Sequence, residues 1–285
     1  MRSINKQVIV GIGEILWDIF PDGKKAGGAP VNFAFHASTP ETESYAISAV
    51  GTDELGNEVL SLLNENKIKN IIKKVDHPTG TVLVELNNGI PTYTITENVA
   101  WDYIPFSLEI NKIAQQTNAV CFGTLAQRSP TSKDTIHQFL ARVPSESFKV
   151  LDLNLRSPFY SDSIIIESIQ LCNTLKMNEE ELQVLKSIFS LNNLSDLKAC
   201  EWLMYTHKLK YLILTAGDKY SMIFSPNNVS YLETPRVDVV DTVGAGDSFT
   251  AAFITSLLGG STLVDAHKKA VKLSAAVCSV AGAWT

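Results

Sequence analysis

The chain has 285 residues, of which 45% are hydrophobic and 19% charged, a composition typical of a globular protein with a sizeable core. Lys and Arg number 24 against 30 Asp and Glu, so the formal net charge is −6, and no basic run of the kind that binds nucleic acid is present. The 4 cysteines are far apart and the 5 histidines lack metal-ligand spacing, which argues against a zinc site or a disulfide framework. Reduced thiols, with neither a long apolar run nor a signal-peptide pattern, predict a cytoplasmic protein that does not enter a membrane.

The N-terminal part of the chain predicts alternating strands and helices. Strands are expected at 8–13, 15–20 and 44–50, and helices at 31–37 and 53–66. Asp53 follows Thr52 at the position of a helix cap. Glu14 and Asp18 are acidic residues embedded among apolar ones, and an acid so placed needs a partner or a ligand.

The next segment predicts a β-hairpin instead of another βα unit. Apolar residues alternate with others on both sides of the turn Asn87-Asn88-Gly89. Because this hairpin interrupts the βα pattern, we expect it to leave the main sheet as an inserted β lid at about 79–103 that covers a ligand. Its apolar face could pair with a second copy in a homodimer or pack on its own domain, and the sequence leaves both open.

The βα pattern resumes after the hairpin and continues to the C-terminus. Strands are expected at 119–122, 150–153, 174–177 and 211–214, and helices at 132–143, 179–189, 197–207, 246–258 and 262–280. Right-handed crossovers between such units build a doubly wound, mostly parallel sheet. No internal repeat or long polar linker interrupts the chain, so we predict a single α/β domain over 1–285 that carries the small β lid.

The segment 241–249 carries the most chemistry. Gly244 and Gly246 flank Ala245 directly before an apolar helix, so backbone N–H groups can crowd around an anion at a helix N-terminus. A phosphate fits such a site. Asp247, in the first turn, could accept the proton of a hydroxyl held beside that phosphate, which is general-base catalysis. For an isolated Gly-x-Gly-Asp, a plain helix-capping role would be the better interpretation.

At this segment the sequence resembles the PfkB family of carbohydrate kinases, also called the ribokinase family. The family signature Asp-Thr-x-Gly-Ala-Gly-Asp is matched by 241–247 at every specified position. The resemblance implies a ribokinase-like fold and assigns the catalytic base to Asp247. It also implies that the backbone of Gly244, Ala245 and Gly246 forms the anion hole that stabilises the transferring phosphoryl group, and that Gly244 and Gly246 contact ATP.

Two N-terminal features resemble the sugar-binding residues of the same family. Gly27-Gly28-Ala29-Pro30-Val31-Asn32 is similar to its Gly-Gly-x-x-x-Asn signature, which implies that Gly28 and Asn32 face the sugar, and the Ala-Pro form is common in fructokinases. Without the other motifs, a Gly-Pro turn before a helix explains this segment equally well. Asp18 matches the strand acid that binds two sugar hydroxyls, although Glu14 could be the binding acid with Asp18 as a cap.

Residues for the nucleotide and for metal ions follow from the resemblance too. Asn178 and Glu181 resemble the Asn-x-x-Glu motif that organises Mg²⁺ and phosphate indirectly, although an acidic run also suits a helix N-terminus. Thr215 and Gly217 match the ATP-phosphate loop Thr-x-Gly-x-x-Gly, whose second glycine is Tyr220 here, where the next strand could begin. A monovalent-cation site, suited to K⁺, is implied at Asp241, Val243 and Gly282.

Three further residues bear on the substrate. Arg156 follows a central strand, where ligands bind in open α/β sheets, and could hold a sugar hydroxyl or a phosphate. Arg128 is expected to be a surface ion-pair residue. Trp101, in an Ala-Trp-Asp segment that resembles fructokinases, is predicted to cover the sugar, with a place in the core as the alternative.

Together these features predict an ATP-dependent, Mg²⁺-requiring sugar kinase, with fructose favoured as the acceptor and fructose 6-phosphate as the product. A ribokinase or a 2-keto-3-deoxygluconate kinase is the alternative within the family. A Rossmann dehydrogenase is excluded as an interpretation of Gly11-x-Gly13, because the Gly-x-Gly-x-x-Gly motif requires a third glycine where this chain has Leu16. A non-catalytic sugar or nucleotide sensor is the remaining alternative, and the presence of Asp247 argues against it.

Overall fold

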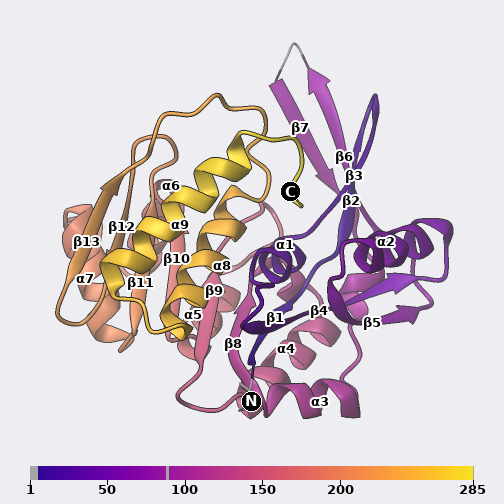
Figure 1. The fold of residues 1–285 in the computed structure, drawn as a ribbon, viewed down its shortest axis with the longest axis horizontal. Coiled ribbons are helices and arrows are strands. Elements are labelled where there is room, and N and C mark those ends of the chain that lie inside the picture. Colours follow the sequence, from indigo (N-terminus) through magenta and orange to yellow (C-terminus); the bar gives the residue numbers. More distant parts are fainter. Residues whose placement is uncertain (1–5, 88–89, 285) are drawn as a thin grey trace.

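Residues 6–87 and 90–284 are described by a computed structural model of the protein (Figure 1). Within these residues nine strands form the main sheet, in the order β13-β12-β11-β10-β9-β8-β1-β4-β5. Their bounds are β1 Gln7–Ile12, β4 Thr42–Gly51, β5 Lys69–Val75, β8 Thr117–Phe122, β9 Phe148–Asp152, β10 Thr174–Asn178, β11 Tyr211–Thr215, β12 Tyr220–Phe224 and β13 Val229–Glu233. The strands from β11 to β5 are all parallel, and β12 and β13 are antiparallel at one edge. The predicted α/β sheet is confirmed.

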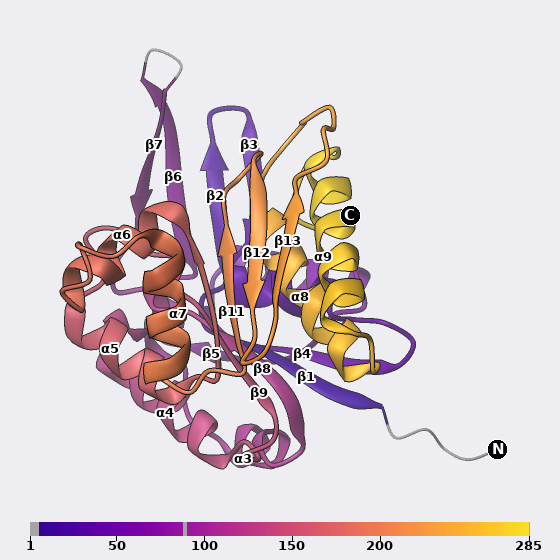
Figure 2. The ribbon, with the colours of Figure 1, turned by 90° about the vertical axis from the view of Figure 1, so that its left-hand side faces the viewer.

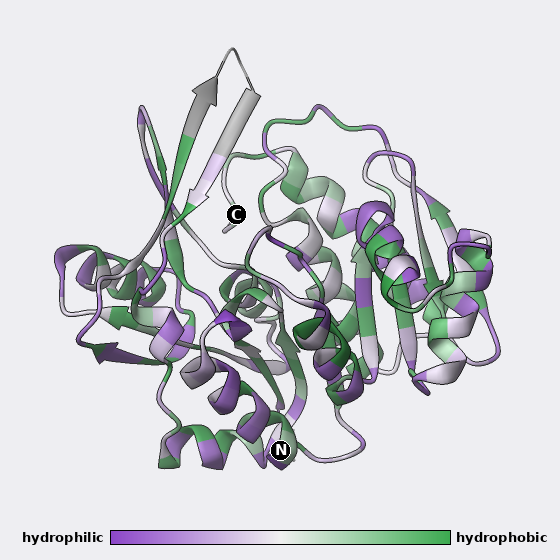
Figure 3. Cartoon of the chain, turned by 180° about the vertical axis from the view of Figure 1, so that it is seen from behind, coloured by the Kyte–Doolittle hydropathy of each residue, from purple (hydrophilic) through white to green (hydrophobic). Residues whose placement is uncertain are grey.

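Helices cover both faces of this sheet (Figure 2). They are α1 Ala29–His36, α2 Glu54–Glu65, α3 Leu108–Ala114, α4 Pro130–Arg142, α5 Asp162–Leu171, α6 Glu179–Ile188, α7 Asp196–Thr206, α8 Ala245–Leu258 and α9 Leu263–Cys278, with 3-10 turns at Ala100–Tyr103 and Leu125–Arg128. Helices α3 to α7 pack on one face in one core cluster, while α1, α8 and α9 pack on the other. Several of the helices in front of the sheet in Figure 3 carry both hydrophobic and hydrophilic residues, as expected for an outer layer with one buried side.

A second, smaller sheet stands beside the main one and contains the predicted hairpin. Its order is β3-β2-β6-β7, with β2 Leu16–Phe20, β3 Gly23–Gly27, β6 Gly80–Asn87 and β7 Ile90–Ile95. The hairpin β6-β7 pairs through β6 with β2, so the small sheet draws on residues well before the predicted lid. Val82 and Val84 pack with Leu16 of β2, which realises the alternative that the hairpin packs on its own chain. The predicted turn extends over 88–89, outside the described residues.

The lid boundary at 103 needs a correction. The segment Ala100–Tyr103 belongs to the main core, because Ala100 and Trp101 are fully buried there and Ser132 of α4 donates a hydrogen bond to the carbonyl of Trp101 at 2.7 Å.

Helix α2 begins as predicted: Asp53 is its cap, and Oδ1 of Asp53 accepts a hydrogen bond from the Gly56 amide at 2.8 Å. In the part of the chain that the structure describes, no helix is both long and apolar enough to cross a membrane.

Candidate active site

The glycine-rich segment forms the N-terminus of α8. Gly244 is the cap residue and adopts a φ of 79°, in the left-handed region that favours glycine. A Cβ on Gly244 would lie 2.8 Å from Cβ of Ala283, so the C-terminal segment leaves no room for a side chain. The amides of the first turn of a helix have no acceptor within the helix and carry its positive dipole end. The backbone of Gly244, Ala245 and Gly246 can therefore receive an anion.

Asp247 lies in the first turn of α8 and contacts α1. Asn32 donates a hydrogen bond from Nδ2 to Oδ2 of Asp247 at 2.8 Å, and Oδ1 of Asn32 accepts one from the indole of Trp284 at 2.8 Å. These two bonds fix the orientation of the amide group. Burial, together with the nearby Asp152 carboxylate, raises the pKa of Asp247 to about 6, against the hydrogen bond from Asn32. Trp284 was not predicted from the sequence, since nothing in its local pattern points to this contact.

Of the predicted sugar residues, Gly28, Asn32, Asp18 and Arg156 lie around this part of the site, and Trp101 does not. Gly28 adopts a φ of 123°, and a Cβ there would lie 2.3 Å from the carbonyl oxygen of Glu14, so only glycine fits. The exposed Arg156 lies close enough for its charge to lower the pKa values of Asp18 and Asp247. Burial outweighs that effect at Asp18 and raises its pKa. Carboxylates, an amide and a guanidinium thus converge on one place, which suits a ligand with several hydroxyl groups.

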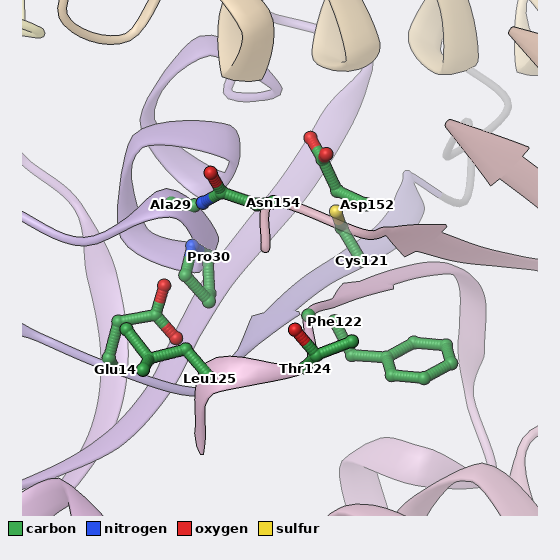
Figure 4. Close-up of a pocket in the computed structure, with 10 residues that line it drawn as sticks. Glu14, Ala29, Pro30, Cys121, Phe122, Thr124, Leu125, Asp152 and Asn154 are labelled. Atoms are coloured by element: carbon green, nitrogen blue, oxygen red, sulfur yellow. The ribbon is translucent and has the colours of Figure 1, made fainter. Parts of the chain in front are cut away.

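Glu14 is almost fully buried beneath this site. It is 4% exposed, and within the described residues its Oε2 atom has no hydrogen-bond partner. Desolvation raises the pKa of Glu14 to about 7. Figure 4 shows its carboxyl group at a cavity that Thr124, Asp152 and Asn154 also line. The cavity has a volume of about 10 Å³, which fits one water molecule. Glu14 therefore faces this small cavity, while Asp18 lies on β2 with its side chain partly exposed.

The residues predicted for a monovalent cation also lie together. Oδ1 of Asp241 accepts a hydrogen bond from the Val243 amide at 3.0 Å, and Oδ2 accepts one from the Gly282 amide at 3.1 Å. Nζ of Lys25 lies 3.0 Å from the same Oδ2 atom. In this conformation the charge of the Asp241 carboxylate is thus balanced by a lysine of β3.

Asn178 and Glu181 form a capping box at the start of α6. Oδ1 of Asn178 accepts from the Glu181 amide at 2.8 Å, and Oε2 of Glu181 accepts from the Asn178 amide at 2.9 Å. Oε1 of Glu181 accepts from the Leu155 amide at 2.9 Å. Among the described residues no group of three or more His, Cys, Asp or Glu could hold a metal ion.

The predicted ATP-phosphate loop follows β11. Thr215 ends that strand and pairs in register with Asn178 on β10, so the two predicted phosphate regions are neighbours. Gly217 adopts a left-handed φ of 57°, and a Cβ there would meet nothing within 4 Å. Tyr220 is the first residue of β12, where the sequence allows the next strand to begin, and its hydroxyl donates a hydrogen bond to Oε1 of Glu179 at 3.1 Å.

The predictions for Trp101 and Arg128 each need a correction: for Trp101 the core alternative holds, and for Arg128 the ion pair is present but is not on the surface. Trp101, expected to cover the sugar, is a core residue with 0% exposure, so its ring has no surface to offer a ligand. Arg128, expected to be a surface ion-pair residue, does form an ion pair, with Nε 2.8 Å from Oδ1 of Asp102, but its side chain is only 8% exposed and its guanidinium lies 4.0 Å from the centre of the Trp101 ring. The pair was missed because Asp102 and Arg128 meet only through the packing of two short 3-10 turns.

An apolar pocket, which no sequence motif predicts, lies near the anion loop. It has a volume of about 540 Å³ between α9 and the segment after β13, and is lined by Leu232, Glu233, Pro235, Val237, Lys268, Val271, Lys272, Ala275 and Ala276. Ser274, the residue before Ala275, donates a hydrogen bond to the carbonyl of Ala245 at 2.9 Å. The pocket is therefore within about one helical turn of the anion loop.

Comparison with known proteins agrees with this geometry. Residues 21–285 match the model of the pfkB family carbohydrate kinases. The chain belongs to this family. The sugar kinase PH1459 of Pyrococcus horikoshii is 27% identical over 98% of this chain and 92% of its own length. An ATP-dependent 6-phosphofructokinase of Thermoanaerobacterium thermosaccharolyticum is 26% identical over 95% and 87% of the two chains, and a fructokinase of Salmonella typhimurium 26% over 89% and 85%.

Solved structures of pfkB kinases share the fold. The crystal structure of PH1459, described as an uncharacterized sugar kinase, superposes with a TM-score of 0.80 at 25% identity, covering 98% of this chain and 94% of that one. A fructokinase of Xylella fastidiosa with bound ATP has a TM-score of 0.86 at 17% identity, with the same coverage of 98% and 94%. The fold is thus the ribokinase-like α/β fold, and the chain is a carbohydrate kinase of the pfkB family.

Proposed function

We propose that this kinase transfers the γ-phosphoryl group of ATP to a hydroxyl of fructose, giving fructose 6-phosphate and ADP. The observation that carries the proposal is the position of Asp247, held by Asn32 at the N-terminus of α8 and facing the cluster that contains Asp18 and Arg156. A sugar held by that cluster presents a hydroxyl to Asp247, while a phosphoryl group lies on the backbone of 244–246.

In the proposed reaction the sugar oxygen attacks the γ-phosphorus and the bond from that phosphorus to the β,γ-bridging oxygen breaks. ADP leaves with the bond electrons, and Asp247 accepts the hydroxyl proton. Asp18, Gly28 and Asn32 fix which hydroxyl points at Asp247. The amides of the first turn of α8 balance the charge on the phosphoryl oxygens in the transition state.

The apolar pocket beside α9 fits the base of the nucleotide. Val271 and Ala275 provide apolar walls for a flat ring, and Lys268 and Lys272 add positive charge at its edge. Thr215 and Gly217 would contact the phosphates between this pocket and the anion loop. Substitution of Ala275 by Trp should raise the KM for ATP and leave the KM for the sugar unchanged.

Metal ions complete the proposal. Mg²⁺ would be held mainly by the ATP phosphates, with Asn178 and Glu181 acting indirectly, since both oxygens of Glu181 already accept backbone amides. K⁺ would lie near Asp241, Val243 and Gly282, where it takes over the charge balance that Lys25 provides here. A homodimer formed through the small sheet, where Tyr93 is 60% exposed, stays a prediction that light scattering tests.

Fructose is favoured because the Gly-Gly-Ala-Pro form of the sugar motif resembles fructokinases and because relatives with that activity cover most of the chain. The test is ADP release with Mg²⁺-ATP and K⁺ against fructose, ribose, glucose, 2-keto-3-deoxygluconate and adenosine. Rapid turnover with fructose alone supports the proposal. If another acceptor is preferred, the kinase activity stands and fructose is replaced as the proposed substrate. Sugar binding with no turnover of any acceptor would favour the sensor.

A further inference from the structure

A buried ion pair lies directly behind the anion loop. Asp152 ends β9, and Lys176 is its register partner on the neighbouring strand β10. Nζ of Lys176 lies 2.7 Å from Oδ2 of Asp152, and the two side chains are 10% and 7% exposed. The free-energy cost of removing two charges from water is about as large as the gain from their attraction. A pair this buried is therefore not expected to add much to the stability of the fold. Its position suggests another reason for its presence.

The ammonium group of Lys176 occupies the space that a side chain at position 246 would need. A Cβ on Gly246 would lie 3.1 Å from Nζ of Lys176. The positive charge therefore lies next to the first turn of α8. Its field adds to that of the helix N-terminus at the same backbone atoms.

Asp247 is surrounded by charged groups from several elements. Asp152 of β9 raises the pKa of Asp247. Lys176 of β10 and Arg156, in the segment after β9, lower this pKa, and so does the hydrogen bond that Asn32 of α1 donates to Asp247. Glu14, between β1 and β2, and Cys121 of β8 also lie within range of its charge. Of these groups Lys176 is the buried cation, since Arg156 is exposed. Three carboxyl groups, those of Asp152, Glu181 and Asp247, thus share one buried ammonium.

We propose that Lys176 is a positioning residue for phosphoryl transfer: oriented by Asp152, its ammonium group keeps Asp247 ionised and strengthens the positive potential at residues 244–246. The proposal rests on the proposed function, because it assigns to Asp247 the role of the base. Lys176 touches neither sugar nor nucleotide in this account and acts through Asp247 and Gly246.

The test compares Lys176→Met with Lys186→Met. Lys186 is a matched control: its side chain is 9% exposed and its Nζ lies 2.7 Å from Oδ1 of Asp196, between α6 and α7. For each variant kcat/KM is measured from pH 5 to 9 with the preferred sugar. We expect Lys176→Met to move the acid limb of the profile upward by about one pH unit and to lower the plateau at least about tenfold. Lys186→Met should leave both unchanged.

An unmoved acid limb and plateau in folded Lys176→Met would overturn the inference and leave the kinase proposal intact. If that variant does not fold, the double variant with Asp152→Asn removes both buried charges, and a wild-type plateau in it would also overturn the inference. Lys176→Arg keeps the charge, so its acid limb should stay at the wild-type position even if its plateau falls.

A carboxyl-carbon NMR titration of Asp247 reads the same shift without turnover. It separates failure of this inference from failure of the proposed function: an upward shift in Lys176→Met supports the role of Lys176 even if the wild-type protein phosphorylates no sugar tested.

Discussion

Asn32 donates a hydrogen bond to Asp247 at 2.8 Å across a separation of 215 residues. The bond joins the N-terminal sugar motif on α1 to the phosphoryl-transfer motif on α8. Because a hydrogen bond to the ionised form lowers a carboxyl pKa, Asn32 both orients the proposed base and opposes the effect of its burial.

The first prediction concerns pH. The pKa of Asp247 is about 6 and the carboxyl group must be ionised to accept a proton, so kcat/KM should be constant above that value. Below it, kcat/KM should fall by about tenfold for each pH unit. Initial rates from pH 4.5 to 8 at low sugar concentration measure this. A profile that is flat down to pH 5 would contradict the assignment of the base.

The second prediction concerns Asn32→Ala. The change removes the hydrogen bonds to Asp247 and from Trp284, so kcat should fall by about tenfold to a hundredfold. The acid limb should also move upward, since a bond to the ionised form is lost. Asn66→Ala is the control, because Asn66 bonds only its own helix end, at the carbonyl of Leu62, among the contacts that the structure describes. Equal losses in both variants would contradict a special role for Asn32.

The third prediction compares two glycines with similar backbone conformations. Gly244 has a φ of 79° and Gly260 a φ of 82°, but a Cβ would clash with Ala283 only at Gly244 and meets nothing within 4 Å at Gly260. Both Ala variants should lose about 1–2 kcal/mol of unfolding free energy from backbone strain. Gly244→Ala should lose more unfolding free energy than Gly260→Ala, because of the clash with Ala283, and its turnover should also fall. Urea denaturation and ADP release measure the two effects, and normal turnover of Gly244→Ala would contradict the proposed anion hole.

The fourth prediction concerns the stability that Glu14 contributes. Its pKa is about 7 in the folded chain against 4.5 unfolded, so the folded state holds the extra proton between these values. Glu14 therefore adds to the free energy of unfolding below about pH 4.5. This stabilisation, roughly 3 kcal/mol, is lost as the pH rises to about 7.

Glu14→Gln is neutral at every pH and should escape that loss. The unfolding free energy of this variant, relative to the wild type, should rise between pH 5 and 8. Denaturant titrations at both values measure it, and a constant difference would show that Glu14 stays ionised when folded.

Much of the fold followed from the sequence, and the parts that did not have physical reasons. Strands such as β1 and β8 are continuous apolar runs because both their faces are buried. Edge strand β5 is Lys-Asn-Ile-Ile-Lys-Lys-Val, whose lysines hide the strand pattern, and β3 contains Gly-Lys-Lys. Helix α5 was missed because its run of three isoleucines favours a strand.

The site divides in the same way. Short sequence motifs predict Asp247, Asn32 and Asp18, because each motif is recognisable without knowledge of the fold. Lys176 and Asp152 meet only through the register of two parallel strands, and Trp284 reaches Asn32 only after the C-terminal segment has folded back. Contacts of that kind depend on tertiary structure, so no local pattern predicts them.

The most direct test of the account is ADP release with fructose by Asp247→Asn beside Asp162→Asn. Asp162 also lies in the first turn of a helix, α5, but is exposed and outside the site. Asp247→Asn should reduce kcat at least about a hundredfold with the sugar still bound, while Asp162→Asn keeps wild-type turnover. Wild-type turnover by Asp247→Asn would contradict the account.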